Sequence, residues 1–458
     1  MSLLIKNGSI ITSCRNFQAD ILINSGKIAG IGHHLIHQDT PVKIIDADGK
    51  YIFPGGIDPH VHMHLPTPAG FSSDDFYTGS RAALFGGTTS IIDFVTPQKG
   101  QSLVEALKMR QKEAGNSLAD FSFHVSPVDF HQNIENEIKE CVRQGVTSFK
   151  IYLAYKNTIG LEDENILKVL KTVGKLGGIV TAHCEMGDDI ERLRNSFFEN
   201  GQTSPMHHAL SRPDVAEAEA VKKLIEMAAV ADCPVYIVHV SAARSLEHIQ
   251  KAQQKGQPVF AETCPHYLLL DDSKYSGIFE KTVPFVISPP LRQKQDQNAL
   301  WKAINEGIIQ TVGTDHCPFN FSQKAIGLND FRKIPNGAGG IEHRMALLFT
   351  YGVLEKRISL EKFVEITSTN AARIFGIFPA KGQIAKGADA DLVIWNPATE
   401  NVISTKNHHQ NCDINIFEGL KTLGSPEFVI KNGEVILENG VIVKDSAVNF
   451  LKRSPNRY

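Results

Sequence analysis

The stretch FPGGIDPHVH, residues 53–62, decides how the fold of this chain is interpreted. A Gly/Pro turn leads into a short apolar strand that carries His60 and His62. Alternate side chains of a strand point to the same side, so both imidazoles are expected to face one direction. Working outward, short runs rich in Val, Ile and Phe recur at residues 90–95, 121–127, 148–153, 178–185, 235–241, 258–265 and 309–317.

Segments with helical periodicity separate these runs, for example residues 102–114, 134–145 and 216–230. Strands that alternate with helices of this length indicate βαβ units and a parallel sheet. With the first stretch included there are eight strands, the number that closes a (β/α)8 barrel of ~250 residues or more. The sequence therefore predicts an α/β fold with a TIM-like barrel at residues 54–385.

The two ends of the chain have a different pattern. Residues 3–11, 19–32 and 42–53 alternate apolar and polar positions between Asn-Gly, Ser-Gly and Asp-Gly pairs, and residues 388–397 and 428–443 repeat the pattern. Such pairs supply the positive φ angles of tight hairpins, which indicates antiparallel strands. Neither end can bury a core alone. We expect residues 1–53 and 386–445 to form one small β-sandwich domain, followed by an irregular C-terminal tail at 446–458.

Composition limits the partners. The 458 residues include 47 basic and 50 acidic side chains, a formal charge of −3, whereas nucleic acid or an anionic membrane as main partner requires a basic excess. No apolar run is long enough to span a bilayer, and the first residues lack a signal-peptide core. We expect a soluble, cytoplasmic protein. Seven cysteines scattered singly are typical of reduced thiols.

Six polar residues fall at or near the ends of the predicted barrel strands, where such barrels carry their catalytic groups. They are His60, His62, Lys150, His183, His239 and Asp315. Taken singly, a His-x-His pair can be a chance pairing on a loop, and a strand-end histidine is often a satisfied core residue. Lys150 lies in the apolar run SFKIYL, where desolvation lowers the pKa of an amine. It is either half of a buried salt bridge or a neutral amine carboxylated by carbon dioxide.

The motifs together carry a resemblance. Over nearly its whole length the chain resembles the cyclic amidohydrolases of the dihydropyrimidinase/hydantoinase family. The matching motifs are PGGIDPHVH (54–62), SFKIYLAYK (148–156), TAHCE (181–185), IVHVS (237–241), ISPPLR (287–292), GTDHCP (313–318) and PNGAGGIE (335–342).

The resemblance implies a barrel plus a β-sandwich, two Zn²⁺ per chain and usually a homotetramer. By position, His60, His62 and Asp315 would hold the first metal and His183 and His239 the second. Carboxylated Lys150 would bridge the two. Other divalent metals could take the same positions.

The same resemblance implies a reaction. A metal-bridging hydroxide would open the cyclic amide of a neutral ureide, a 5,6-dihydropyrimidine or a 5-substituted hydantoin, to the N-carbamoyl amino acid, as in pyrimidine catabolism. Asp315 would be the general acid and base, and Tyr155 would donate to the developing oxyanion. Main-chain groups of Ser288 and Asn336 would hold the ring, although Asn336-Gly337 alone reads as a turn.

Three alternatives remain open. Dihydroorotases resemble the chain but continue the metal motif as His-x-His-x-Arg, where the arginine binds the substrate carboxylate; here His64 takes that position. An allantoinase-like enzyme is the second alternative. The third is a non-catalytic assembly protein like the collapsin response mediator proteins, which lack part of the metal set. All six positions are filled in this sequence.

Overall fold

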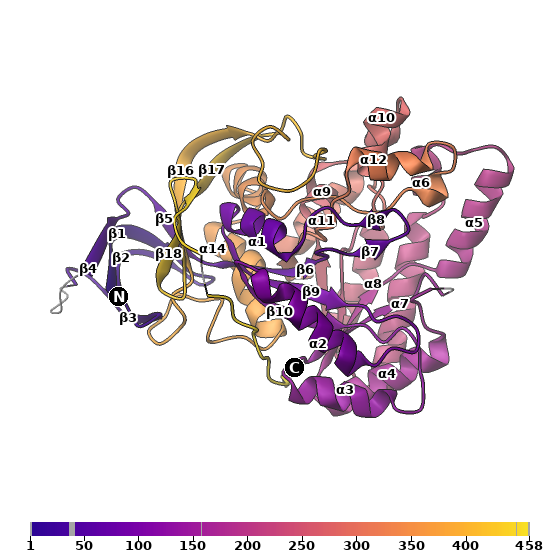
Figure 1. Cartoon of the computed structure of the whole chain (residues 1–458), viewed down its shortest axis with the longest axis horizontal. Coiled ribbons are helices and arrows are strands. Elements are labelled where there is room, and N and C mark those ends of the chain that lie inside the picture. Colours follow the sequence, from indigo (N-terminus) through magenta and orange to yellow (C-terminus); the bar gives the residue numbers. More distant parts are fainter. Residues whose placement is uncertain (1, 36–41, 157, 446, 457–458) are drawn as a thin grey trace.

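The computed structural model describes residues 2–35, 42–156, 158–445 and 447–456, and the barrel lies beside a sheet built from the chain ends (Figure 1). Eight parallel strands form one sheet in the order β15-β14-β13-β12-β11-β10-β9-β6. A single bridge between Val61 and His316 links the two ends of this order. The strands are β6 (Gly56–Val61), β9 (Thr88–Val95), β10 (Asp120–Val125), β11 (Ser148–Tyr152), β12 (Ile179–His183), β13 (Val235–Ile237), β14 (Val259–Thr263) and β15 (Thr311–Val312).

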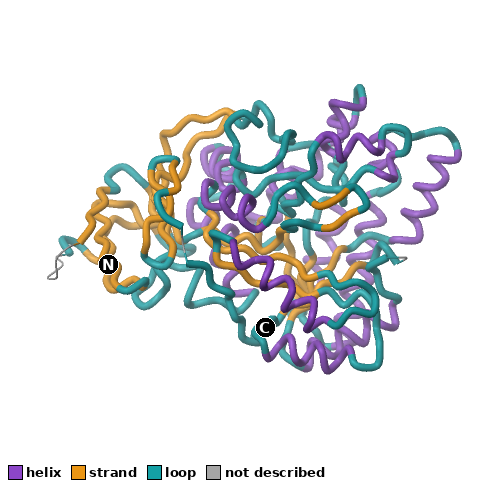
Figure 2. Tube along the Cα trace, in the orientation of Figure 1, coloured by secondary structure: helices purple, strands orange, loops and turns teal. Residues whose placement is uncertain are grey.

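Helices surround these strands, as Figure 2 shows. In the described chain, the helices before β15 lie in the connections between consecutive barrel strands, which is the arrangement that parallel pairing requires, and four more follow the last barrel strand. The helices before β15 are α1 (Phe76–Phe85), α2 (Leu103–Glu113), α3 (Ile134–Arg143), α4 (Asp163–Lys175), α5 (Gly187–Glu199), α6 (Pro205–Leu210), α7 (Asp214–Ala231), α8 (Ala243–Gln254), α9 (Pro265–Leu269), α10 (Phe279–Thr282) and α11 (Lys294–Asn305). After β15 come α12 (Phe321–Lys324), α13 (Arg344–Leu348), α14 (Leu360–Val364) and α15 (Asn370–Ile374). The expected (β/α)8 barrel is confirmed.

A second sheet is built from both ends of the chain. Its order is β19-β18-β17-β16-β5-β1-β2-β3, with β4 also paired to β1. The strands are β1 (Ser2–Ile11), β2 (Asn16–Asn24), β3 (Lys27–Gly32), β4 (Val42–Asp46), β5 (Tyr51–Pro54), β16 (Leu392–Val402), β17 (Lys421–Lys431), β18 (Glu434–Glu438) and β19 (Val441–Ile442). A separate two-stranded ribbon, β7 (Pro66–Thr67) and β8 (Gly70–Phe71), lies in the loop after β6.

The expectation of purely antiparallel pairing at the N-terminus needs a correction. β4 and β5 both pair parallel with β1, whereas β2, β3 and the C-terminal strands pair antiparallel. Asn7-Gly8 is likewise no hairpin. It forms a bulge within β1, with Asn7 at φ 63°, and a Cβ on Gly8 would lie 2.3 Å from the Cδ1 atom of Ile52. Gly8 therefore allows close packing against Ile52 inside the sheet.

Both faces of the second sheet are covered at β16. Val393 and Trp395 belong to the large core shared with the barrel, and Leu392 and Ile394 belong to a core among the terminal strands. This is the twofold alternation of a strand, with apolar residues on each face. Trp395 packs against Phe53 and Phe349 with ring centroids 6.1 Å and 5.5 Å away. The sheet and the barrel are therefore joined by a continuous apolar interface.

The segment 447–456 is irregular and packs against the barrel; residues 446, 457 and 458 of the expected tail lie outside the described residues. The Leu451 amide donates to the Phe121 carbonyl at 2.7 Å, and the Arg453 amide donates to Gly145 at 2.8 Å. Arg453 is buried and donates to the Ser148 hydroxyl at 2.7 Å. The segment thus lies across the amino ends of β10 and β11, opposite to the ends at which the site residues gather.

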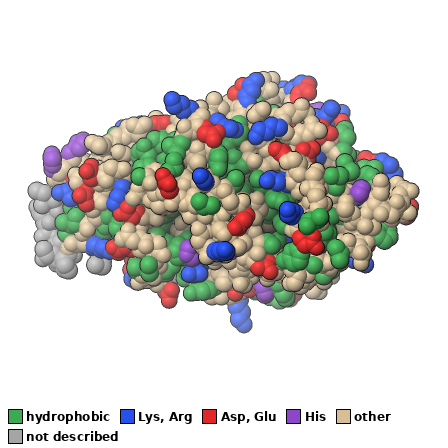
Figure 3. All heavy atoms as spheres, turned by 90° about the horizontal axis from the view of Figure 1, so that it is seen from above, with side chains coloured by type: hydrophobic (Ala, Val, Ile, Leu, Met, Phe, Trp, Pro, Cys, Tyr) green, Lys and Arg blue, Asp and Glu red, His purple; other side chains and the backbone are tan. Residues whose placement is uncertain are grey.

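The seven cysteines are all free thiols, five of them buried. Within the described ranges, no helix combines the length and apolarity that crossing a bilayer requires. Figure 3 shows acidic and basic side chains interspersed over the face seen from above.

Candidate metal centre

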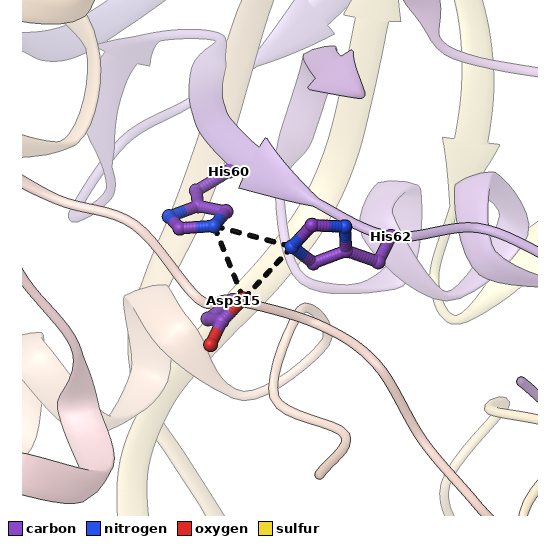
Figure 4. Close-up of side chains that lie close together, drawn as sticks. All are labelled: His60, His62 and Asp315. Atoms are coloured by element: carbon purple, nitrogen blue, oxygen red, sulfur yellow. Dashed lines mark hydrogen bonds and ion pairs between the residues drawn. The ribbon is translucent and has the colours of Figure 1, made fainter. Parts of the chain in front are cut away.

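Three of the predicted ligands meet at one point. The Nε2 atoms of His60 and His62 lie 3.3 Å apart, and each lies 3.1 Å from the Oδ1 atom of Asp315 (Figure 4). His60 is buried, whereas the side chains of His62 and Asp315 keep 13% and 17% exposure, so the cluster is accessible at these two residues. Two imidazole nitrogens and a carboxylate oxygen within 4.8 Å of one another are a suitable set for a divalent cation.

The electrostatics of this cluster favour a cation. Burial disfavours the imidazolium, but the carboxylates of Asp315 and Glu262 outweigh it and raise the pKa of His60 to about 9. Burial also opposes ionisation of Asp315, but the neighbouring imidazoles, His60 first, hold the pKa of that carboxyl well below its usual range. A positive charge at this point is therefore stabilised, whether a proton or a metal ion carries it.

His183 and His239 form the second pair. His183 Nδ1 lies 2.9 Å from His239 Nε2, and the His60 and His239 ring centroids are 5.4 Å apart. The four imidazoles thus form one continuous group. Burial lowers the pKa of His183, and burial together with His183 lowers that of His239 well below its usual value. Both rings are therefore neutral, which is the state that binds metals.

Lys150 lies in the middle of β11 with 1% exposure. Its Nζ atom is 4.9 Å from the ring centroid of Phe94 and 5.2 Å from that of Tyr152. Phe94 also stacks on His62 at 4.5 Å, so it places the amine beside the histidines. Among the residues that the structure describes, none donates to or accepts from Nζ. Burial lowers the pKa of this amine to about 8. The alternative of a buried salt bridge therefore finds no partner in the described chain.

The donor set therefore fits a divalent metal centre. The nitrogens of two histidines and a carboxylate oxygen converge on one point, two neutral histidines face each other beside it, and the buried Lys150 amine has no hydrogen-bond partner among the described residues. A buried polar group without a partner is costly. Binding a cation and carboxylating Lys150 would satisfy these groups.

Three residues that follow strands β11, β13 and β15 have positive φ: Tyr155 at 59°, His239 at 42° and Asp315 at 50°. This conformation is unfavourable for residues other than glycine and clusters at functional sites. It turns each side chain just beyond a strand end, because Tyr155 follows β11, His239 follows β13 and Asp315 follows β15. No local sequence pattern indicated these turns.

The three residues that the resemblance assigns to substrate binding lie on segments connected to one another or to the cluster. The ring of Tyr155, half-buried, lies 5.3 Å from that of His183. Ser288 and Asn336 are also half-buried, and their segments are joined by the Gly337 amide, which donates to Val286 at 3.1 Å. The Cys317 amide donates to Ala338 at 3.0 Å, which fixes the Asn336 segment beside the one that carries Asp315.

Two buried carboxylates behind the histidines were not predicted from the sequence. Glu262 Oε1 lies 2.6 Å from His60 Nδ1, and Glu185 Oε2 lies 2.8 Å from His183 Nε2. Such partners fix the ring orientation and raise the basicity of a ligand. Each glutamate lies near the end of a predicted apolar strand, in the segments AHCE (182–185) and AETC (261–264). That placement is the sequence feature that could have indicated a role at the site.

The comparisons with known proteins agree with this geometry. Residues 51–436 match the amidohydrolase family. The chain is 43% identical to a D-hydantoinase of Geobacillus stearothermophilus, over 99% of this chain and 97% of the relative. It is 41% identical to a D-hydantoinase of Ralstonia pickettii, over 99% of both.

Solved structures show the same relationship. The dihydropyrimidinase from Brevibacillus agri superimposes with a TM-score of 0.98, 43% identity and complete coverage of both chains. The L-hydantoinase from Arthrobacter aurescens superimposes with a TM-score of 0.89 at 27% identity, over 98% of this chain and 99% of that one. The chain therefore belongs to the amidohydrolase family, in its group of hydantoinases and dihydropyrimidinases.

Proposed function

We propose that this protein opens the ring of a neutral cyclic ureide, a 5,6-dihydropyrimidine or a 5-substituted hydantoin, to the N-carbamoyl amino acid. The chain is a hydrolase of cyclic amides, as its full-length relatives are. The observation that carries the proposal is the convergence of His60, His62 and Asp315 beside the buried Lys150, whose amine has no partner in the part of the chain that the structure describes. All six predicted ligand positions are filled, which favours an enzyme over a non-catalytic assembly protein.

We assign the metal ligands as the sequence predicted them. His60, His62 and Asp315 would hold one Zn²⁺, His183 and His239 a second, and Lys150, carboxylated on its amine, both. A lowered pKa supports the carboxylation, because only the neutral amine adds carbon dioxide. Bound divalent ions would polarise the substrate carbonyl and would lower the pKa of bound water toward ~7.

Asp315 is suited to proton transfer. Its Oδ1 atom faces both imidazoles, whereas no described residue donates to Oδ2. This oxygen can accept a proton from the attacking water and return it to the ring nitrogen as the C–N bond breaks. Tyr155, at the edge of the cluster, would donate to the oxygen of the tetrahedral intermediate. Main-chain groups of Ser288 and Asn336 would orient the ring.

The surroundings favour a neutral ring over dihydroorotate. His64, at the position of the carboxylate-binding arginine, lies 2.6 Å from Glu113 Oε1 and stacks on Phe71. Two basic residues close in sequence to Ser288 and Tyr155 are also engaged: Arg292 donates to the Ser241 hydroxyl at 3.0 Å, and Lys156 donates to Asp188 at 2.9 Å. A substrate carboxylate would therefore be desolvated without a bidentate partner.

The remaining assignments rest on the family resemblance. We propose a homotetramer that acts in pyrimidine catabolism in the cytoplasm. We also propose a division of the chain into a β-sandwich domain (1–53 and 386–445), a catalytic barrel (54–385) and a tail (446–458).

A substrate panel tests the proposed reaction. The kcat/KM of the zinc-loaded enzyme is measured for dihydrouracil, a 5-monosubstituted hydantoin, allantoin and dihydroorotate. We expect a neutral ring to exceed dihydroorotate by at least a hundredfold, because an unpaired buried carboxylate costs several kcal/mol and each ~1.4 kcal/mol is a factor of ten. Dihydroorotate or allantoin as the best substrate would overturn the assignment.

A further inference from the structure

A buried arginine links the proposed oxyanion donor to the second pair of histidines. Arg212, at the junction of α6 and α7, is 1% exposed. Its Nη1 atom donates to Glu185 Oε2, the oxygen that faces His183. Its Nη2 atom donates to the Tyr155 hydroxyl at 3.3 Å, and its Cζ atom lies 5.5 Å from the Tyr155 ring centroid. One guanidinium therefore contacts both groups.

The direction of these hydrogen bonds matters. A guanidinium has only donors, so the Tyr155 oxygen must accept from Arg212. The phenol's own proton is then directed away from Arg212 and is free for another acceptor. No other described residue shares a hydrogen bond with this hydroxyl. Arg212 therefore leaves the hydroxyl proton of Tyr155 available for donation to a developing oxyanion.

Arg212 is itself held rigidly. Arg292 Nη1 donates to the Arg212 carbonyl, and Arg292 is fixed by the Ser241 hydroxyl and by Glu217. Tyr155, by contrast, is half-buried and lies at the start of a loop with positive φ. A donor preorganised by a fixed charge costs little reorganisation during the reaction.

We propose that Arg212 is a positioning residue: anchored by Glu185, it holds the Tyr155 hydroxyl as an oxyanion donor. This proposal rests on the proposed role of Tyr155. Arg212 acts through Tyr155, and it stabilises the transition state more than the bound substrate. Its loss should therefore lower kcat with little change in KM.

A double-mutant cycle of Arg212→Lys and Tyr155→Phe tests the proposal. Lysine keeps the charge beside Glu185 but lacks the fork that reaches both partners. We expect Tyr155→Phe to lower kcat by about 10²–10³-fold, the usual loss for an oxyanion donor, and Arg212→Lys by about tenfold or more. The double variant should equal Tyr155→Phe within about threefold, because the two residues act as one unit. The matched control is Arg194→Lys, because Arg194 lines a cleft together with Tyr155 but donates to the Arg332 carbonyl.

The outcomes separate the two proposals. Normal kcat in Tyr155→Phe would overturn the role of Tyr155 itself. An impaired Tyr155→Phe with a normal Arg212→Lys, or losses that multiply in the double variant, would overturn the role of Arg212 alone. Metal content and melting temperature are measured in parallel and should match the wild type. Metal loss in Arg212→Lys would show that Arg212 serves His183 instead. If Arg212→Lys does not fold, Arg212→Gln, whose amide can still donate to Tyr155, replaces it in the cycle and should retain more kcat than Tyr155→Phe.

Discussion

Replacing Glu262 with glutamine should weaken the first metal position without disturbing the fold. Glu262 is fully buried; its Oε1 accepts from His60 Nδ1 at 2.6 Å and from the His239 amide at 3.2 Å. Its Oε2 accepts from the Tyr236 hydroxyl at 2.8 Å. Glutamine keeps the shape and the contact to His60 but removes the charge that orients and polarises the ring.

The size of the effect follows from that contact. Loss of a carboxylate behind a metal-binding histidine typically costs 10–100-fold in metal affinity, which is about 1.4–2.7 kcal/mol. We therefore expect the Kd of the first Zn²⁺ to rise by about that factor. The measurement is a titration of metal-free protein with Zn²⁺ in competition with a chromophoric chelator, with circular dichroism as the check of folding.

Glu217→Gln is the matched control. Glu217 is a buried carboxylate of the same barrel, but it accepts from Ser241 and Ser245 and contacts none of the proposed ligands. Its variant should keep the wild-type Kd within about threefold. A Glu262→Gln protein that binds Zn²⁺ as tightly as the wild type, or no more weakly than Glu217→Gln, would refute the argument that this carboxylate supports His60.

Three other changes test separate parts of the molecule. Lys150→Ala should abolish turnover, and short carboxylic acids plus metal should partly restore it, because the proposed carbamate contributes oxygens; wild-type turnover in the variant would contradict the bridge. Lys381→Met should lower the free energy of unfolding, measured in urea, by about 3–5 kcal/mol, because it leaves the buried Asp391 carboxylate without its ion-pair partner. The control is Lys27→Met, which removes an exposed ion pair and should cost less than about 1 kcal/mol. Burial lowers the pKa of the Lys324 amine from 10.5 to about 7. Between these two pH values the amine is protonated in the unfolded state but neutral in the folded state. Lys324 therefore makes the free energy of unfolding rise as the pH rises from about 7 to about 10. Melting temperatures from pH 7 to 10 should rise less steeply in Lys324→Met; parallel curves would count against the shift.

Patterns of neighbouring residues were enough to predict the barrel and to identify the candidate metal ligands. The alternation of strands with helices predicted the barrel, because the periodicity of buried positions is set by neighbours in the chain. Spacing by two placed His60 and His62 on one side. The motifs at successive strand ends also carried the family resemblance, since catalytic groups of such barrels gather there.

What the sequence left open depends on contacts between distant segments. His60 and Glu262 are 202 residues apart, and nothing near either residue indicates the other. The same holds for Arg212 and Tyr155, which the helices after β12 bring together. The parallel pairing of β4 and β5 with β1 and the positive φ of Asp315 also arise only in the closed structure. Periodicity is a local property of the chain, whereas pairing, orientation and backbone strain are decided when the barrel closes and the ends of the strands meet.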